Sequence, residues 1–143
     1  MNRISHILSR KGKNTIHVLP DTTVLEALKV MAENNIGSVV IMEDNKFLGV
    51  VTERDYSRKV ILKGKNSTDT KVTEIMTTDF PELKPDDTVE YCMQLLTEHN
   101  IRYLPVFEGN DFKGIISISD VVSETMIMQQ QTIDHLDSYI NSK

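Results

Sequence analysis

Two short motifs in this chain contain the residue types and spacing that can bind a polar ligand. Residues 52–55 (TERD) and residues 117–120 (SISD) each place a hydroxyl three positions before a carboxylate. This spacing is typical of a capping box, which satisfies free N–H groups at the start of a helix. The same helix start can bind an anion such as phosphate, and a carboxylate can accept two hydrogen bonds from a ribose diol. The pattern alone therefore leaves a structural cap and a nucleotide site equally open.

Basic side chains near these motifs are candidates for phosphate contacts. Arg102 occupies the position that Gly37 holds 65 residues earlier, and a guanidinium presents a planar fork to an oxyanion. The chain also has two clusters of basic residues. The first comes before the first predicted strand and contains Arg10, Lys11 and Lys13, and the second begins within the first motif and contains Arg54, Arg58 and Lys59. Short runs of charge are usually solvated surface, so each of these residues also has a purely structural interpretation. Their clustering favours one or two phosphate contacts.

No pattern of residues indicates catalysis or metal binding. The chain contains no nucleophile–base constellation and no Gly-rich phosphate loop of the dinucleotide or P-loop type. The histidines lie at no metal-ligand spacing, and they are His6, His17, His99 and His135. The single cysteine, Cys92, is expected to be small apolar filler on a buried helix face. We therefore expect a protein that is not an enzyme and that requires no cofactor or metal.

Composition sets wider limits on function. The chain has 143 residues, of which 39% are hydrophobic, as in a folded globular domain. Its net charge of −5 argues against nucleic acid as a partner, because phosphate backbones need a basic surface. No apolar run approaches the ~20 residues of a membrane span, and no apolar signal segment begins the chain. A cytoplasmic protein without membrane contact is expected.

The chain repeats itself. Residues 20–55 align without a gap on residues 85–120 when the chain is shifted by 65 positions, and about a third of the aligned positions are identical. The identical pairs include Pro20 and Pro85, Val24 and Val89, Asn35 and Asn100, Ile36 and Ile101, Gly49 and Gly114, and Asp55 and Asp120. Two copies of one structural unit are therefore predicted.

The elements of each copy follow from its pattern. A Pro-Asp-x-Thr start precedes apolar residues at helical spacing, and two short apolar strands follow across a polar turn. The predicted strands are residues 39–42 and 48–51 in the first copy and residues 104–107 and 114–118 in the second. A second helix begins near Glu53 and near Val121, and an apolar leader (residues 4–8 and 72–76) and an extended segment (residues 15–19 and 80–83) precede each copy. One copy has too few strands to bury its helices, so a pair must share a core.

These motifs resemble a tandem pair of cystathionine β-synthase (CBS) repeats, a Bateman module. The resemblance runs from Ile4 to about Val122 and includes a TERDYxRKV segment typical of stand-alone bacterial pairs. It implies an α+β fold of two tandem strand-helix-strand-strand-helix repeats with pseudo-two-fold symmetry and packed sheets. The expected domains are residues 1–67, residues 68–125 and a C-terminal helix over residues 126–143. The strand residues expected to be mostly buried are Val39, Val40, Ile41, Val50, Val51, Leu104, Val106, Ile115 and Ile116.

The resemblance also implies a ligand, which is an adenine nucleotide (AMP, ATP or NAD(H)) bound in clefts between the repeats. Adenine would lie on apolar strand residues, the ribose would meet the motif Asp, and the phosphates would meet hydroxyls and basic side chains. One cleft would combine Arg102, Ile115, Ser117, Ser119 and Asp120 with Ile16, Ile36 and Gly37, and Lys13 would approach its phosphate. The other would combine Val50, Thr52, Arg54 and Asp55 with Pro81, Ile101 and Tyr103. The arginine and the two hydroxyls of the first cleft favour tighter binding there.

The function implied is a regulatory module that signals to an unidentified client protein and forms a homodimer. The alternatives are a ligand-free scaffold or dimerisation module and, from a different class, an enzyme acting on a nucleotide. Leu25 and Met31 are expected to contribute an exposed apolar face to the dimer. The stripe of Met126, Ile133, Leu136 and Ile140 is compatible with packing on its own subunit or with a dimer contact.

Overall fold

The computed structural model describes residues 2–12 and 15–141, which form two compact units. The central unit is Asn14–Phe80, and the terminal unit combines Met1–Lys13 with Pro81–Lys143. The chain is therefore α+β and carries both repeats, as expected, but its compact units do not coincide with the sequence repeats. The first leader belongs to the same unit as the second repeat. How the two sheets pack on each other stays a prediction.

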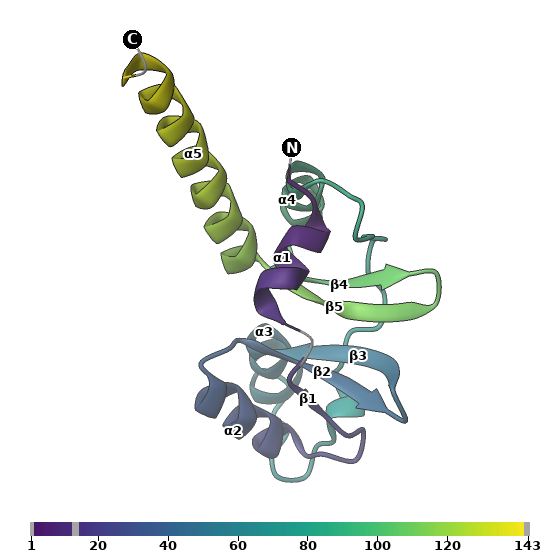
Figure 1. Cartoon of the computed structure of the whole chain (residues 1–143). Coiled ribbons are helices and arrows are strands. Elements are labelled where there is room, and N and C mark those ends of the chain that lie inside the picture. The colour runs from purple at the N-terminus through teal and green to yellow at the C-terminus, as the bar shows by residue number, and fades with distance from the viewer. Residues whose placement is uncertain (1, 13–14, 142–143) are drawn as a thin grey trace. The chain divides into compact units, whose positions relative to one another are not determined.

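The central unit is built on a three-stranded sheet (Figure 1). Its strands are β1 (His17–Val18), β2 (Ser38–Glu43) and β3 (Lys46–Thr52), with β1 parallel and β3 antiparallel to β2. Its helices are α2 (Val24–Asn34), α3 (Glu53–Tyr56), the π-helical turn η1 (Ser57–Ile61) and the short 3-10 helix η2 (Val72–Glu74).

The terminal unit is built on the hairpin of β4 (Tyr103–Glu108) and β5 (Asp111–Ser117). Its helices are α1 (Ile4–Lys11), α4 (Val89–Glu98) and α5 (Ile118–Asn141). The extended segment expected at residues 80–83 is not assigned as a strand, although the Phe107 N–H donates to the Leu83 carbonyl at 3.0 Å. The boundary expected at residue 126, between the second repeat and the C-terminal helix, falls inside α5. This helix continues without a break because no Pro or Gly interrupts it.

The repeated sequence motifs begin and end the first helix of each repeat. Thr23 and Thr88 cap α2 and α4, because their hydroxyls accept the N–H groups of the third following residues at 3.2 and 3.1 Å. Asn35 and Asn100 follow these helices with left-handed φ angles of 54° and 51°, a conformation that Asn tolerates. The Pro-Asp-x-Thr and Asn-Ile motifs are thus helix start and stop signals.

The repeated glycine lets each hairpin accept a leader segment. A Cβ atom on Gly49 would lie 2.8 Å from the Met76 sulfur and 2.9 Å from the Thr77 carbonyl oxygen. A Cβ atom on Gly114 would lie 2.9 Å from a Leu8 methyl group, and the φ angle there is +147°. The first hairpin therefore receives the second leader, and the second hairpin receives the first leader. This exchange explains why the compact units differ from the sequence repeats.

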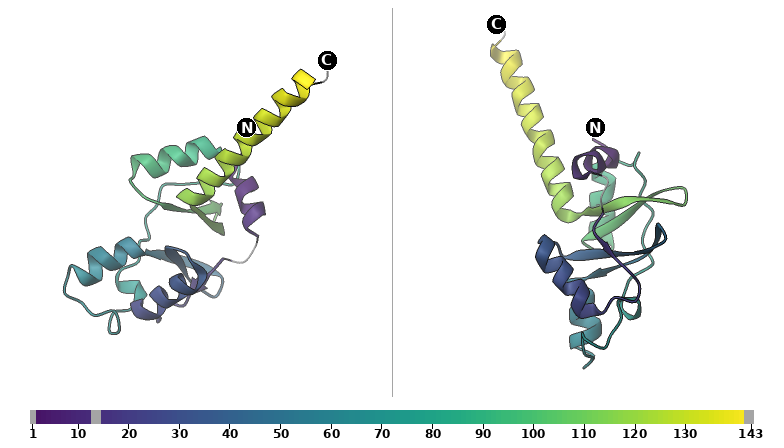
Figure 2. Two further views of the ribbon diagram at one scale, coloured as in Figure 1. Left: turned by 90° about the vertical axis from the view of Figure 1, so that its left-hand side faces the viewer. Right: turned by 60° about the horizontal axis from the view of Figure 1, so that its bottom comes forward.

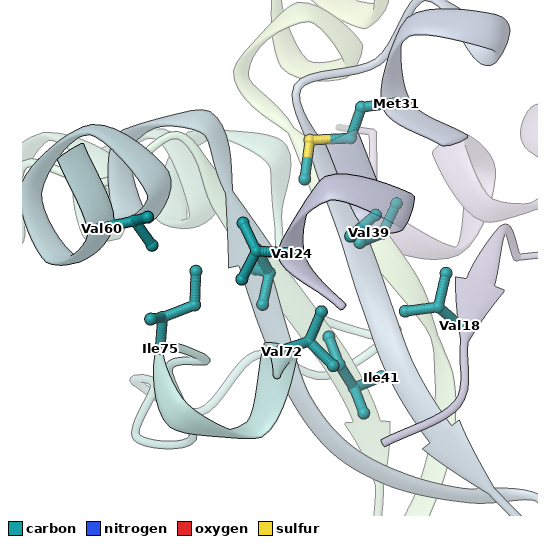
Figure 3. Packing of buried hydrophobic residues seen from close by; sticks show 10 residues of the cluster. Val18, Val24, Met31, Val39, Ile41, Val60, Val72 and Ile75 are labelled. Atoms are coloured by element: carbon teal, nitrogen blue, oxygen red, sulfur yellow. The ribbon is translucent and has the colours of Figure 1, made fainter. Parts of the chain in front are cut away.

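The core of the central unit lies between its sheet and its helices (Figure 3). Val24, Ala27 and Met31 of α2 pack there with Val39, Ile41 and Val51 of the sheet, and with residues of η1 and η2. Met31 is 2% exposed, so its expected place on an exposed apolar face is wrong, because its position in α2 faces the sheet. Of the nine strand residues expected to be buried, eight are buried and Ile115 is half-buried.

Helix α5 has two different parts. Val121 and Glu124 in its first turns are buried, and the helix packs there on α4 and α1. Every residue from Gln129 to Asn141 is exposed, and the helix continues well past α1 and α4 (Figure 2). Within the residues that the structure describes, no helix is both long and apolar enough to cross a membrane.

Candidate functional site

Both predicted motifs form the junction between a strand and a helix. In the central unit, the Asp55 N–H donates to the Thr52 hydroxyl at 3.0 Å, and Asp55 Oδ2 accepts the Thr52 N–H at 2.9 Å. In the terminal unit, the Asp120 N–H donates to Ser117 Oγ at 3.1 Å, and Asp120 Oδ2 accepts the Ser117 N–H at 2.8 Å. Both motifs are complete capping boxes.

The two carboxylates differ in how fully the chain itself engages them. At Asp55 the capping box uses Oδ2, while Oδ1 lies 3.1 Å from Lys59 Nζ and 3.5 Å from the Thr77 hydroxyl. At Asp120 the capping box and the ion pair with Lys11 Nζ, at 2.7 Å, both use Oδ2. The Asp55 side chain is 11% exposed and the Asp120 side chain is 21% exposed. The carboxylate of the terminal unit is therefore the more accessible one.

In each unit, the residue that precedes the first strand of the hairpin contacts the capping box. The Glu53 N–H donates to the Gly37 carbonyl at 3.1 Å, and the Ile118 N–H donates to the Arg102 carbonyl at 2.9 Å. This backbone contact brings the exposed Arg102 to the start of α5, next to Ser117. The backbone of Arg102, the two hydroxyls of residues 117–120 and the helix start therefore lie at one end of the β4–β5 hairpin.

The N-terminal basic cluster has partners within the terminal unit. Lys11 Nζ donates to the Ile115 carbonyl at 2.7 Å as well as to Asp120. Arg10 Nε donates at 2.8 Å to Glu124, which is 2% exposed and also accepts a hydrogen bond from the Asn2 side chain. These two ion pairs hold the end of α1 on the first turns of α5. Sequence reasoning missed Glu124, because a glutamate within a helix carries no signal that it is buried.

The remaining predicted site residues fall into two sets, one in each unit. The central set is Ile16, Ile36, Gly37, Thr52, Arg54 and Asp55, and the terminal set is Arg102, Tyr103, Ile115, Ser117, Ser119 and Asp120. Ile16 and Ser119 are exposed, whereas Ile36, Arg54, Tyr103 and Ile115 are half-buried. Lys13 lies outside the described residues. We call each set a half-site, because the joining of residues from both units into one cleft stays a prediction.

Comparison with known proteins decides the family. The family model described as "CBS domain" matches residues 4–61 and again residues 72–126. This chain belongs to the CBS domain family. The two matches cover both leaders and both capping boxes. All twelve half-site residues lie within the matched ranges.

Relatives of this CBS pair span most of its length. A mitochondrial CBS domain-containing protein of Arabidopsis thaliana is 35% identical over 96% of this chain and 71% of its own length. The crystal structure of a CBS-domain containing protein from Agrobacterium tumefaciens is 33% identical, with a TM-score of 0.80 over 87% of this chain and 99% of that chain. A CBS domain protein from Pyrobaculum aerophilum, solved in complex with AMP, is 23% identical, with a TM-score of 0.71 over 83% of this chain and 89% of that chain, and therefore shows that the fold is shared.

Cys92 lies near the terminal half-site, but its thiol is not activated as a nucleophile. Burial, with smaller contributions from the negative charges of Asp120 and Asp87, raises the pKa of its thiol to about 12. The thiol is thus protonated at neutral pH, whereas a reactive cysteine requires a thiolate. Cys92 is 0% exposed, as is the equivalent Ala27, so the prediction of buried apolar filler is confirmed.

Proposed function

We propose that this CBS pair is a regulatory module that binds an adenine nucleotide and signals its presence to a client protein. The observation that carries the proposal is the terminal half-site. There, Ser117 and Asp120 form the start of a 24-residue helix, and the backbone carbonyl of Arg102 accepts the Ile118 N–H of that helix at 2.9 Å. Hydroxyl, carboxylate, guanidinium and helix start are the four groups that a ribose phosphate needs.

Each group has a distinct role in this proposal. The Asp120 carboxylate accepts hydrogen bonds from the ribose diol, and adenine lies on the apolar strand surface near Ile115. The phosphate meets Ser117, Ser119 and the guanidinium of Arg102. The positive end of the α5 dipole adds to this attraction. The proposed ligands are AMP, ATP and NAD(H), which share an adenosine phosphate.

The terminal half-site is proposed to bind more tightly than the central one. Its carboxylate is more exposed, its basic residue replaces Gly37, and its helix is long, whereas α3 has only 4 residues before η1 begins. Asp55 in the central half-site is engaged through both oxygens. A ligand there would have to displace more internal contacts before it gained its own.

Isothermal titration calorimetry tests the proposal directly. We expect AMP, ATP or NAD(H) to bind at roughly micromolar strength, which corresponds to about −8 kcal/mol. We expect GTP to bind more weakly, because the apolar strand surface offers guanine no carboxylate. Asp120→Ala should weaken binding by about 1–3 kcal/mol, and Asp55→Ala should weaken it less. Asp134→Ala, in the exposed part of the same helix, is the matched control and should bind as the wild type does.

A second function is favoured by a specific observation. Both capping boxes are complete within the chain, and both carboxylates already pair with a lysine. These contacts suit a scaffold that needs no ligand. Failure of all three adenine ligands to bind or to raise the melting temperature, at concentrations up to a millimolar, would favour the scaffold. A bound nucleotide that is turned over on prolonged incubation would instead favour an enzyme.

A further inference from the structure

The outer part of α5 lacks the packing that usually maintains a helix. Residues 129–141 are all exposed, and the side-chain hydrogen bonds described there are local ones, such as Gln130 to Asp134 at 2.9 Å. Many residues of this part are weak helix formers, including Thr132, Ile133 and Ser138. Isolated helices of about this length are marginal in water. An apolar partner along its side would supply the packing that this part of the helix lacks.

One face of α5 has the spacing of a coiled-coil contact. Val122, Met126, Gln129, Ile133, Leu136 and Ile140 follow one another at intervals of four, three, four, three and four residues. We call these six residues the seam. Their spacing is a heptad pattern in which Met126, Ile133 and Ile140 occupy position a, and Val122, Gln129 and Leu136 occupy position d. The five apolar members are 50–65% exposed, and the seam runs for about 27 Å along the helix.

The seam lies on a different side of α5 from its contacts within the terminal unit. Val121 and Glu124 face α1 and α4 and are buried. At about 100° per residue, the centre of the seam lies roughly a third of a turn from these two residues. The helix can therefore keep its contacts with its own unit while the seam meets another helix.

The polar residue of the seam identifies the partner as a second copy of this chain in parallel orientation. In a parallel in-register pair, Gln129 faces Gln129 of the second copy, and each amide can donate to and accept from the other. In an antiparallel pair with full overlap, Gln129 would face Ile133 and leave its amide without a partner, which costs stability. The flanking Asp137 would face Thr132 in the parallel pair, so no like charges meet across the seam.

We propose that α5 forms a parallel two-stranded coiled coil with α5 of a second copy, through the seam from Val122 to Ile140. This contact uses neither half-site, so it does not depend on the proposed function. It assigns a dimerisation surface to a helix that begins within the second CBS match and continues past its end at residue 126.

Disulfide cross-linking of the full chain tests the orientation and register. The background is Cys92→Ala, which matches the Ala27 of the other repeat and removes the single native cysteine. Leu136→Cys places a thiol at position d, and Ser138→Cys places one at position f, on the far side of the helix. We expect oxidised Leu136→Cys to yield mostly covalent dimer at micromolar concentration, and Ser138→Cys to yield at most a tenth as much. Equal cross-linking of the two variants, or none at position 136, overturns the proposal.

Sedimentation equilibrium provides a second measurement that does not need a cysteine. Leu136→Lys introduces facing like charges into the seam, whereas Ser138→Lys adds the same charge outside it. We expect the dimer dissociation constant to rise at least a hundredfold for Leu136→Lys and to change less than threefold for Ser138→Lys, with unchanged near-ultraviolet circular dichroism in both. A wild-type monomer, or a dimer that Leu136→Lys leaves intact, overturns the proposal. The second result would locate the dimer contact on another face of the CBS pair.

Discussion

Removing the two motif carboxylates one at a time should affect stability unequally. Asp55→Ala removes a capping box, an ion pair and a weak contact with a hydroxyl, all at a side chain that is 11% exposed. Loss of a cap typically costs about 0.5–2 kcal/mol. The Lys59 ion pair adds less than a fully buried pair would, about 1 kcal/mol, because the lysine is 43% exposed. We therefore expect Asp55→Ala to lower the free energy of unfolding by about 1.5–3 kcal/mol.

Asp120→Ala removes a capping box and an ion pair at a more exposed place. The Asp120 and Lys11 side chains are 21% and 36% exposed, so solvent screens their attraction. The cap contributes most of the loss, and we expect about 1–1.5 kcal/mol in total. Asp120→Ala should therefore remain folded at room temperature, which makes it a sound variant for the binding experiment.

Urea unfolding followed by far-ultraviolet circular dichroism measures both variants. Asp134→Ala serves as the control, because the hydrogen bond described for its side chain is an exposed one with Gln130. It should fall within about 0.5 kcal/mol of the wild type. The reasoning is refuted if Asp120→Ala destabilises the chain as much as Asp55→Ala or more. That result would mean that the loss of stability does not depend on how exposed the carboxylate is or on whether both of its oxygens are engaged.

Three further changes have expected outcomes. Gly49→Ala should lower the thermal midpoint by the equivalent of about 1–3 kcal/mol, because the new Cβ meets the rigid Thr77 carbonyl; an unchanged midpoint would contradict the leader contact. Arg10→Met should cost about 1–3 kcal/mol in urea unfolding, because Glu124 stays buried without its cation, and Arg10→Lys should recover part of that loss. The raised pKa of Cys92, about 12 against 9.0, contributes stability that is complete below pH 9 and is lost as the pH rises towards 12. Cys92→Ala should lack that component of the pH profile, and an identical profile would refute it.

Local patterns were sufficient for most elements of this protein, although the extended segment expected at residues 80–83 forms no strand and α5 continues past the boundary expected at residue 126. Thr23 and Asn35 mark the start and end of α2 because capping and left-handed backbone depend on the residue itself and a few neighbours. The repeat at 65 residues predicted the second set of elements and the family in the same way. Burial of the strand residues followed from their apolar pattern, with the exception that Ile115 is only half-buried.

Contacts between distant segments were beyond the reach of those patterns. Each leader resembles the other in sequence, so no pattern could say which hairpin each one packs on, and the answer depends on the contacts of Gly49 and Gly114. Charged residues are usually solvated, so the buried Glu124 and its pairing with Arg10 had no signal in the chain. Sequence by itself determined most of the elements, because these depend on residues close together in the chain. It also determined the repeat and the family, because both follow from comparing such local motifs. Only the tertiary structure decided which leader joins which repeat and which carboxylate stays accessible, because both depend on packing between separate segments of the chain, such as Leu8 on Gly114 and Lys11 on Asp120.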